Sequence, residues 1–203
     1  NGVAACVKHF AANNQEHARQ VSDSVVDERA LREIYLAPFE RVVRRARPWG
    51  VMTAYNRLNG TYCSEHAWLL HDVLRGEWGF DGVCVSDWGA VSDVAASVAA
   101  GLDLCMPGPR ADYAATLEAA VEAGDLDASA VERAARRVLE LAYRAHAGAC
   151  AGSGAPSERL SLARRAAARS AVLLENDGTL PVSPASRIAL IGQFAVEPRY
   201  QGA

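Results

Sequence analysis

Four short, mainly apolar segments within the first 106 residues predict buried β-strands. They occupy residues 3–7, 50–54, 83–85 and 102–106. A continuous apolar run of this length is typical of a strand that is covered on both faces, as in parallel sheets. Polar or bulky side chains follow each run, including Lys8 and His9 after the first and Asp87 after the third. The pattern therefore places chemistry-bearing groups where strands end.

Helical periodicities separate these strand candidates. The longest predicted helix covers residues 27–47 and turns Leu31, Ile34 and Val43 toward one face. It has acidic residues in its first turn and arginines in its last turn, an arrangement that the helix dipole stabilises. Pro38 lies inside it and predicts a kink or a lost internal hydrogen bond. Further helices are predicted over residues 64–79, 91–100, 111–123, 127–145 and 157–170, the first of them with Leu70, Val73 and Leu74 facing inward. Asn59-Gly60 predicts a turn. Strands that alternate with helices indicate parallel βαβ units and an α/β fold.

The chain changes character after its first 147 residues. Residues 148–186 predict a linker region that contains a Gly-rich stretch, one helix and a turn at 176–178. Residues 187–192 predict a buried strand that begins a second α/β domain. We expect residues 187–203 to be only the first part of that domain. Only about four βα units precede the linker, against the eight of a complete barrel of ~250 residues.

Composition narrows the class of protein. The 203 residues are 50% hydrophobic and 22% charged, with a net charge of -3 and interspersed signs, so we expect no nucleic-acid partner. No apolar run approaches the ~18 residues that a membrane span needs. The five cysteines have no metal-ligand spacing, so we expect no metal site, and their odd number favours a reducing compartment. Because the first residue is Asn1, we expect a piece of a longer polypeptide, whose compartment and oligomeric state stay unknown.

Asp87 is the strongest catalytic candidate in the pattern. It stands one residue past the apolar run 83–85, after Ser86, and is followed by Trp88. In parallel α/β proteins, catalytic groups gather at the carboxyl ends of the strands. Taken by itself, an acid after a strand is more often a helix N-cap or a loop carboxylate whose hydrogen bonds are satisfied. The polar groups that follow the neighbouring runs favour the catalytic interpretation.

Six motifs occur in order along the chain, at residues 8–16, 27–36, 51–56, 77–82, 85–88 and 173–178. Together they resemble glycoside hydrolase family 3, in its β-glucosidase branch. The resemblance implies the C-terminal half of a TIM-like (β/α)8 barrel, then a linker and the start of an α/β sandwich domain. It also implies a retaining β-glycosidase that hydrolyses terminal β-D-glycosyl residues of a small-molecule or oligosaccharide β-glycoside, without a cofactor, through a covalent glycosyl-Asp intermediate.

The resemblance also assigns roles to individual residues. Asp87 matches the nucleophile of the family. The sugar-binding positions match Lys8, His9 and Arg19, with Met52 and Tyr55 lining the subsite and Trp88 beside the nucleophile. In relatives the acid/base Glu lies in a later domain, and an earlier barrel strand contributes an Asp and an Arg. We therefore nominate no acid here and expect the chain by itself to be inactive.

Other interpretations of the same residues stay open at this stage. Lys8 and His9 could form an ordinary ion-pair cluster, and Met52 and Tyr55 could simply fill the core. Lys8 could instead serve as the amine of a barrel-type Schiff-base lyase. A non-catalytic, sugar-binding fragment is the third possibility. Glu16, in the first motif, is expected to shape its loop.

Overall fold

The computed structural model describes residues 3–108, 110–149 and 155–199. The chain divides into two compact units, Asn1–Ala151 and Gly152–Ala203. The first unit holds the parallel sheet and every candidate site residue. Each unit is therefore described by itself.

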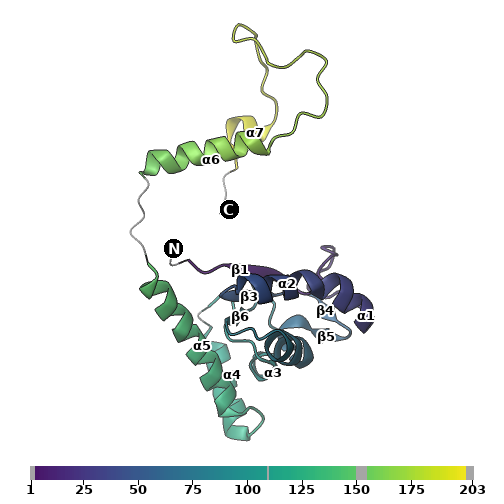
Figure 1. The fold of residues 1–203 in the computed structure, drawn as a ribbon, viewed down its shortest axis with the longest axis vertical. Helices are drawn as coiled ribbons and strands as arrows, with labels where there is room; N and C mark the ends of the chain where they lie inside the picture. The colour runs from purple at the N-terminus through teal and green to yellow at the C-terminus, as the bar shows by residue number, and fades with distance from the viewer. Residues whose placement is uncertain (1–2, 109, 150–154, 200–203) are drawn as a thin grey trace. The chain divides into compact units, whose positions relative to one another are not determined.

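A parallel sheet forms the centre of the first unit. Its strands are β1 (Cys6–Phe10), β3 (Gly50–Thr53) and β6 (Val83–Val85), in the order β1-β3-β6, and they lie side by side in Figure 1. A parallel bridge from Val85 adds Leu104 at the β6 edge. Since all of these pairings are parallel, their carboxyl ends meet at one edge of the sheet. The predicted α/β class with parallel strands is confirmed.

Two of the predicted strands differ from the structure. The first begins three residues later than predicted, because its pairing starts at Cys6 opposite Gly50, so Lys8 and His9 lie within β1 rather than after it. The run 102–106 forms a single bridge instead of a strand. The amides of Asp103 and Leu104 both donate to the Cys84 carbonyl, at 2.9 and 3.1 Å. Two consecutive amides on one acceptor bend the chain away from a regular ladder.

A second, smaller sheet was not predicted. It consists of β2 (Asp23–Ser24), β4 (Arg57–Leu58) and β5 (Thr61–Tyr62), in the order β2-β4-β5. The turn that joins β4 to β5 is the predicted Asn59-Gly60, with φ of 51° and 93°. Positive φ at both central residues matches the twist of a tight hairpin. Strands of two residues are too short to show a period in the sequence.

The helix predicted over residues 27–47 is divided into three segments. They are α1 (Glu28–Ala30), a π-helical segment η1 (Leu31–Leu36) and α2 (Ala37–Ala46). Pro38 lies in the first turn of α2, where a missing amide is tolerated, so the predicted interruption is found. The wider turn buries Leu31 and Leu36, five residues apart, and leaves Ile34 63% exposed. The prediction that Ile34 faces the core is therefore wrong.

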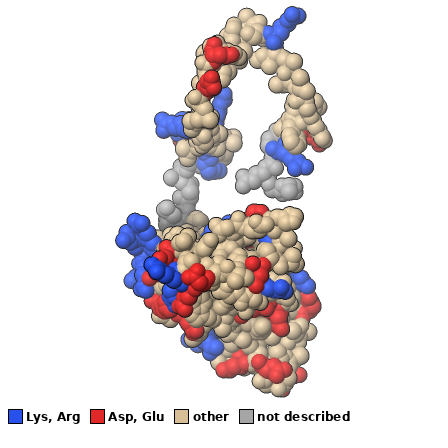
Figure 2. Space-filling model, turned by 90° about the vertical axis from the view of Figure 1, so that its right-hand side faces the viewer, with Lys and Arg blue, Asp and Glu red and all other residues tan. Residues whose placement is uncertain are grey.

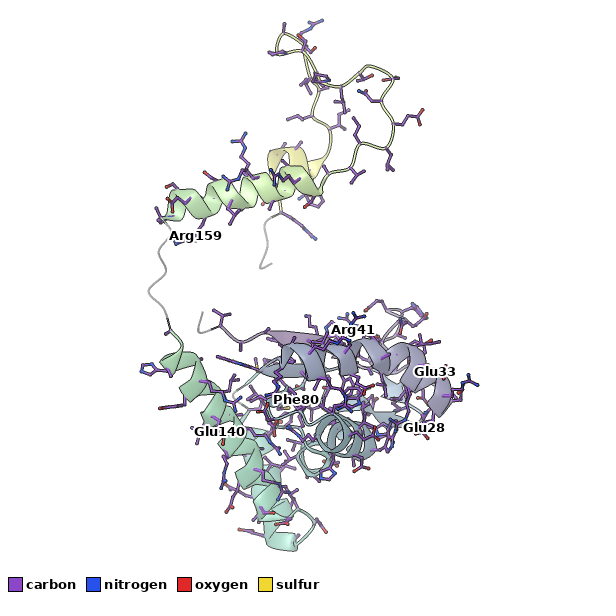
Figure 3. The ribbon with its side chains drawn as sticks, in the orientation of Figure 1. Glu28, Glu33, Arg41, Phe80, Glu140 and Arg159 are labelled. Atoms are coloured by element: carbon purple, nitrogen blue, oxygen red, sulfur yellow. The ribbon has the colours of Figure 1, made fainter. Side chains whose placement is uncertain are left out.

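The other helices of this unit pack around the sheet. They are η2 (Cys63–Glu65, a 3₁₀ turn), η3 (Trp68–Glu77, π-type), α3 (Val94–Ala100), α4 (Ala111–Ala123) and α5 (Ala128–Ala147). Leu70, Val73 and Leu74 of η3 are fully buried, as predicted. Phe80 lies in the interior below α2 (Figure 3). None of the helices in the described part of the chain has the length and apolarity needed to cross a membrane.

Charge is mixed over the surface of the first unit. Figure 2 shows Lys and Arg side chains beside Asp and Glu side chains on one face of it. Many of them form exposed ion pairs, such as Arg29 with Glu33 at 3.0 Å and Arg44 with Glu40 at 2.8 Å. Exposed pairs of this kind contribute little to stability, typically under about 1 kcal/mol each.

The second unit contains α6 (Pro156–Ser170) and α7 (Gln193–Val196). The predicted turn is present: Asn176 Oδ1 accepts from the Gly178 and Leu180 amides, at 3.2 and 3.1 Å. The predicted strand at 187–192 is wrong, because no strand occurs within residues 155–199. Ile191 of that run is 92% exposed. An apolar run becomes a strand only where a neighbouring strand takes its backbone hydrogen bonds.

One buried carboxylate connects three elements of the first unit. The Asp103 side chain is fully buried, and its Oδ2 accepts from Arg75 of η3 at 2.5 Å and from the Cys84 amide of β6 at 2.8 Å. Its Oδ1 accepts from Arg137 of α5 at 2.8 Å. The Arg75 side chain is only 10% exposed, so its charge has little compensation from water. The cluster therefore joins η3, α5 and the sheet.

Replacing Asp103 by Asn should destabilise the full polypeptide by about 3–5 kcal/mol, since it leaves two cations without a compensating charge. Urea unfolding followed by circular dichroism measures this loss. Asp112→Asn is the matched control, because its Arg110 partner is 46% exposed and Asp112 itself 59%. The control should leave the unfolding midpoint close to that of the wild type, because solvent screens an exposed pair. Equal losses in the two variants would contradict a structural role for the cluster.

Candidate active site

Asp87 lies two residues beyond β6 with its side chain 11% exposed. Its Oδ1 accepts from the Trp88 amide at 2.7 Å, and its Oδ2 lies 3.0 Å from His9 Nε2. It caps no helix, because the N-cap of the following helix α3 is Asp93. The alternative interpretation of Asp87 as an N-cap is therefore wrong. Its two oxygens are oriented by two separate groups.

The β1 strand supplies the basic side chains of the site. His9 is partly buried and directs its Nε2 to Asp87. Lys8 is exposed and makes no hydrogen bond or ion pair with the part of the chain that the structure describes. It is also the only lysine in the sequence. The structure therefore joins His9 to Asp87 and leaves the Lys8 ammonium available to a ligand.

Tyr55 connects the end of β3 to the loop after Asp87. Its hydroxyl donates to the Trp88 carbonyl at 3.0 Å. Burial raises the pKa of this hydroxyl, and the negative charge of Asp87 raises it further, so it remains a donor at neutral pH. The Trp88 side chain is 52% exposed, whereas Met52 is buried and pairs in register with Val85 of β6. An exposed indole beside a buried carboxylate is suited to contact a ligand rather than the core.

Arg19 reaches this group from the loop after β1. Its guanidinium lies 4.5 Å from the centre of the Tyr55 ring. Glu16 accepts from Arg19 Nη1 at 2.8 Å, and this hydrogen bond raises the pKa of Arg19. The sequence predicts only a loop-shaping role for Glu16, so this partnership is missed. Its place three residues before Arg19 is the signal that could have identified it as a partner.

Further hydrogen bonds hold the loop that carries Asp87. Ser86 is fully buried, and its hydroxyl accepts from the Met106 amide at 2.8 Å. The Gly89 amide donates to the Met106 carbonyl at 2.9 Å. On the other side, Asn56 Nδ2 donates to the Ala11 carbonyl at 3.3 Å, which ties the end of β3 to the end of β1. The site is therefore built on strand ends that are held together.

The arrangement can perform nucleophilic chemistry on a polyhydroxylated ligand. An oriented carboxylate can attack an electrophilic carbon, and nearby cationic donors can bind hydroxyl groups. No second carboxyl is hydrogen-bonded or ion-paired to Asp87 among the residues described. Two surface hollows lie elsewhere, one of about 570 Å³ between α4 and α5 and one of about 640 Å³ along α5. None of the candidate site residues lines either of them.

Comparisons with known proteins agree on one family. Residues 1–141 match the family described as the glycosyl hydrolase family 3 N terminal domain. Thermostable beta-glucosidase B of Acetivibrio thermocellus is 50% identical over 203 residues, covering 99% of this chain and 27% of the relative. An exo-alpha-(1->6)-L-arabinopyranosidase of Bifidobacterium longum is 41% identical over 99% of this chain and 28% of its own length.

A solved structure of beta-glucosidase 3B from Thermotoga neapolitana, in complex with alpha-D-glucose, aligns with a TM-score of 0.79. It is 41% identical and covers 97% of this chain and 29% of its own. The chain thus spans between a quarter and a third of the length of these relatives. The match over residues 1–141 shows that this chain belongs to glycosyl hydrolase family 3.

Proposed function

We propose that this chain carries the nucleophile and part of the sugar-binding site of a retaining β-glycosidase with β-glucosidase-like activity. The observation that carries the proposal is Asp87, a mostly buried carboxylate after β6 that is oriented by the Trp88 amide and His9. The family membership and the 50% identity to a beta-glucosidase support the same reaction.

We also propose how the chain is organised within the whole enzyme. Residues 1–147 would form the second half of a TIM-like catalytic barrel, 148–186 a linker region, and 187–203 the start of an α/β sandwich domain. Three parallel strands with a fourth bridged segment at the β6 edge are consistent with part of a barrel. In such a barrel the catalytic groups lie at the carboxyl ends of the strands, as Asp87 does here.

The proposed reaction begins with attack of Asp87 on the anomeric carbon of the substrate. A second carboxyl group, ~5–5.5 Å away in retaining enzymes, donates a proton to the leaving group and later activates water. We expect that group to come from a segment other than the residues described here. His9 holds one oxygen of Asp87, and the Trp88 amide holds the other, so the carboxylate is oriented before the substrate binds.

The remaining candidates would hold the glycone. Lys8 and Arg19 offer charged donors to sugar hydroxyls, and His9 offers its imidazole ring. A hydrogen bond from a charged donor typically contributes ~1.5–3 kcal/mol. Tyr55 and Met52 would line the same subsite, with the exposed Trp88 beside it. The relatives include both a beta-glucosidase and an arabinopyranosidase, so the glycone should be assigned with both types of aryl glycoside.

Asp87 is expected to form the covalent intermediate. Incubating the full polypeptide with a 2-deoxy-2-fluoro β-glucoside, which slows hydrolysis of the ester, should label Asp87 alone in peptide mass spectrometry. Asp87→Asn should remove both the label and turnover, whereas Asp93→Asn, at a helix N-cap on the same loop, should retain both. A label on another residue would overturn the assignment.

Lys8 is expected to bind the glycone rather than to stabilise the fold. Lys8→Ala should lower kcat/KM about ten- to a hundredfold, since one charge-assisted hydrogen bond to the substrate is lost. The melting temperature should stay close to that of the wild type, because Lys8 has no partner in the described structure.

Arg41→Ala is the matched control for Lys8→Ala. Arg41 is an exposed cation on α2 (Figure 3), and its removal should change neither kinetics nor stability. If Lys8→Ala lowered the melting temperature and left kcat/KM unchanged, the ordinary structural interpretation of Lys8 would be correct.

A further inference from the structure

A small hollow adjoins the proposed active site. It has a volume of about 80 Å³ and is lined by Gln20, Tyr55, Tyr62 and residues 89–92. Tyr55 belongs to both places, and residues 89–92 directly follow Trp88. No residue of β1 lines the hollow. We call it the Tyr62 hollow.

One wall of the Tyr62 hollow is fixed to the loop of the nucleophile. The Ala90 amide donates to the Asp87 carbonyl at 3.1 Å. The Ala90 carbonyl accepts from the fully buried Ser64 hydroxyl at 3.0 Å. These bonds are made within the protein, so this wall has its shape before any ligand arrives, as is usual in binding sites.

The Tyr62 ring is another part of the lining, and it is held in one orientation. The Arg57 guanidinium lies 4.5 Å from the centre of the Tyr62 ring, and its Nη2 donates to the Tyr62 hydroxyl at 3.2 Å. That hydroxyl in turn donates to the Gln20 carbonyl at 3.3 Å. Because the β4–β5 hairpin and the Gln20 backbone hold it, the ring offers a fixed surface rather than a mobile side chain.

We propose that the Tyr62 hollow is a subsite for the leaving group and takes one edge of a sugar. The proposal rests on the proposed glycosidase function. A leaving group must lie within one sugar ring of Asp87, and the hollow is built on the same loop as Asp87. The glycone donors Lys8 and His9 come from β1, which does not contribute to the hollow.

The chemistry and size of the hollow select the ligand class. Tyrosine rings pack against the apolar face of a pyranose, while the Gln20 amide and the backbone of residues 89–92 can bond hydroxyl groups. A hollow of about 80 Å³ that is open to solvent suits an edge or a hydroxymethyl arm of a sugar.

The test uses two substrates that share a glycone and differ in the leaving group: a β-linked glucose disaccharide and p-nitrophenyl β-glucoside. In the full polypeptide, Tyr62→Ala should lower the ratio of kcat/KM for the disaccharide to kcat/KM for the aryl glucoside about tenfold. Tyr62→Phe keeps the ring and should hold that ratio within about twofold of the wild type. Gln20→Ala, which retains the backbone carbonyl bonded to Tyr62, should lower the ratio as well.

Tyr143→Ala is the matched control, because Tyr143 is a 73% exposed tyrosine on α5 that does not line the hollow. It should leave the ratio unchanged. If Tyr62→Ala and Gln20→Ala reduced both substrates equally, or neither, the leaving-group subsite would be overturned. A wild-type enzyme that hydrolysed neither substrate would overturn the proposed function itself, and the subsite with it.

Discussion

The buried Asp103 carboxylate is the constraint on which the first unit depends. It accepts hydrogen bonds from Arg75, Arg137 and the Cys84 amide, so one side chain binds η3, α5 and the sheet. Breaking a buried ion pair leaves an uncompensated charge, which is far more costly than the loss of a surface pair. The bonds to Cys84 also bend the chain after Asp103, which is why the fourth apolar run forms a bridge rather than a full strand.

That arrangement also positions the proposed active site. Asp103 holds the middle of β6 through the Cys84 amide, and the chain just beyond the carboxyl end of β6 delivers Ser86 and Asp87. Ser86 is bonded to the Met106 amide, so the segment after the bridge supports the nucleophile loop. The orientation of Asp87 therefore depends on the hydrogen bonds that hold the β6 edge of the sheet.

The loops around Asp87 divide the proposed substrate between two sets of elements. β1 contributes Lys8 and His9, whereas the β4–β5 hairpin contributes Tyr62. Tyr55, which follows β3, bonds to the Trp88 carbonyl and also lines the Tyr62 hollow, so it is shared by the two proposed subsites. The residues proposed to bind the leaving group and those proposed to bind the glycone lie on separate segments of the chain. Substitutions in the hairpin would therefore change the preferred leaving group and leave the glycone-binding side chains in place.

The sequence by itself determined the parallel α/β class, the buried face of η3 and the hairpin turn at Asn59-Gly60, because periodicity and turn chemistry are local properties. It also predicts Asp87 as the catalytic candidate, through its place after an apolar run. Only the tertiary structure decided that Ile34 is exposed, that Lys8 lies within β1 and that residues 187–192 form no strand. Those outcomes depend on a π-turn, on strand register and on the presence of a pairing partner. None of these is encoded in a local pattern, since each is set by residues distant in the chain or by how a helix meets its neighbours.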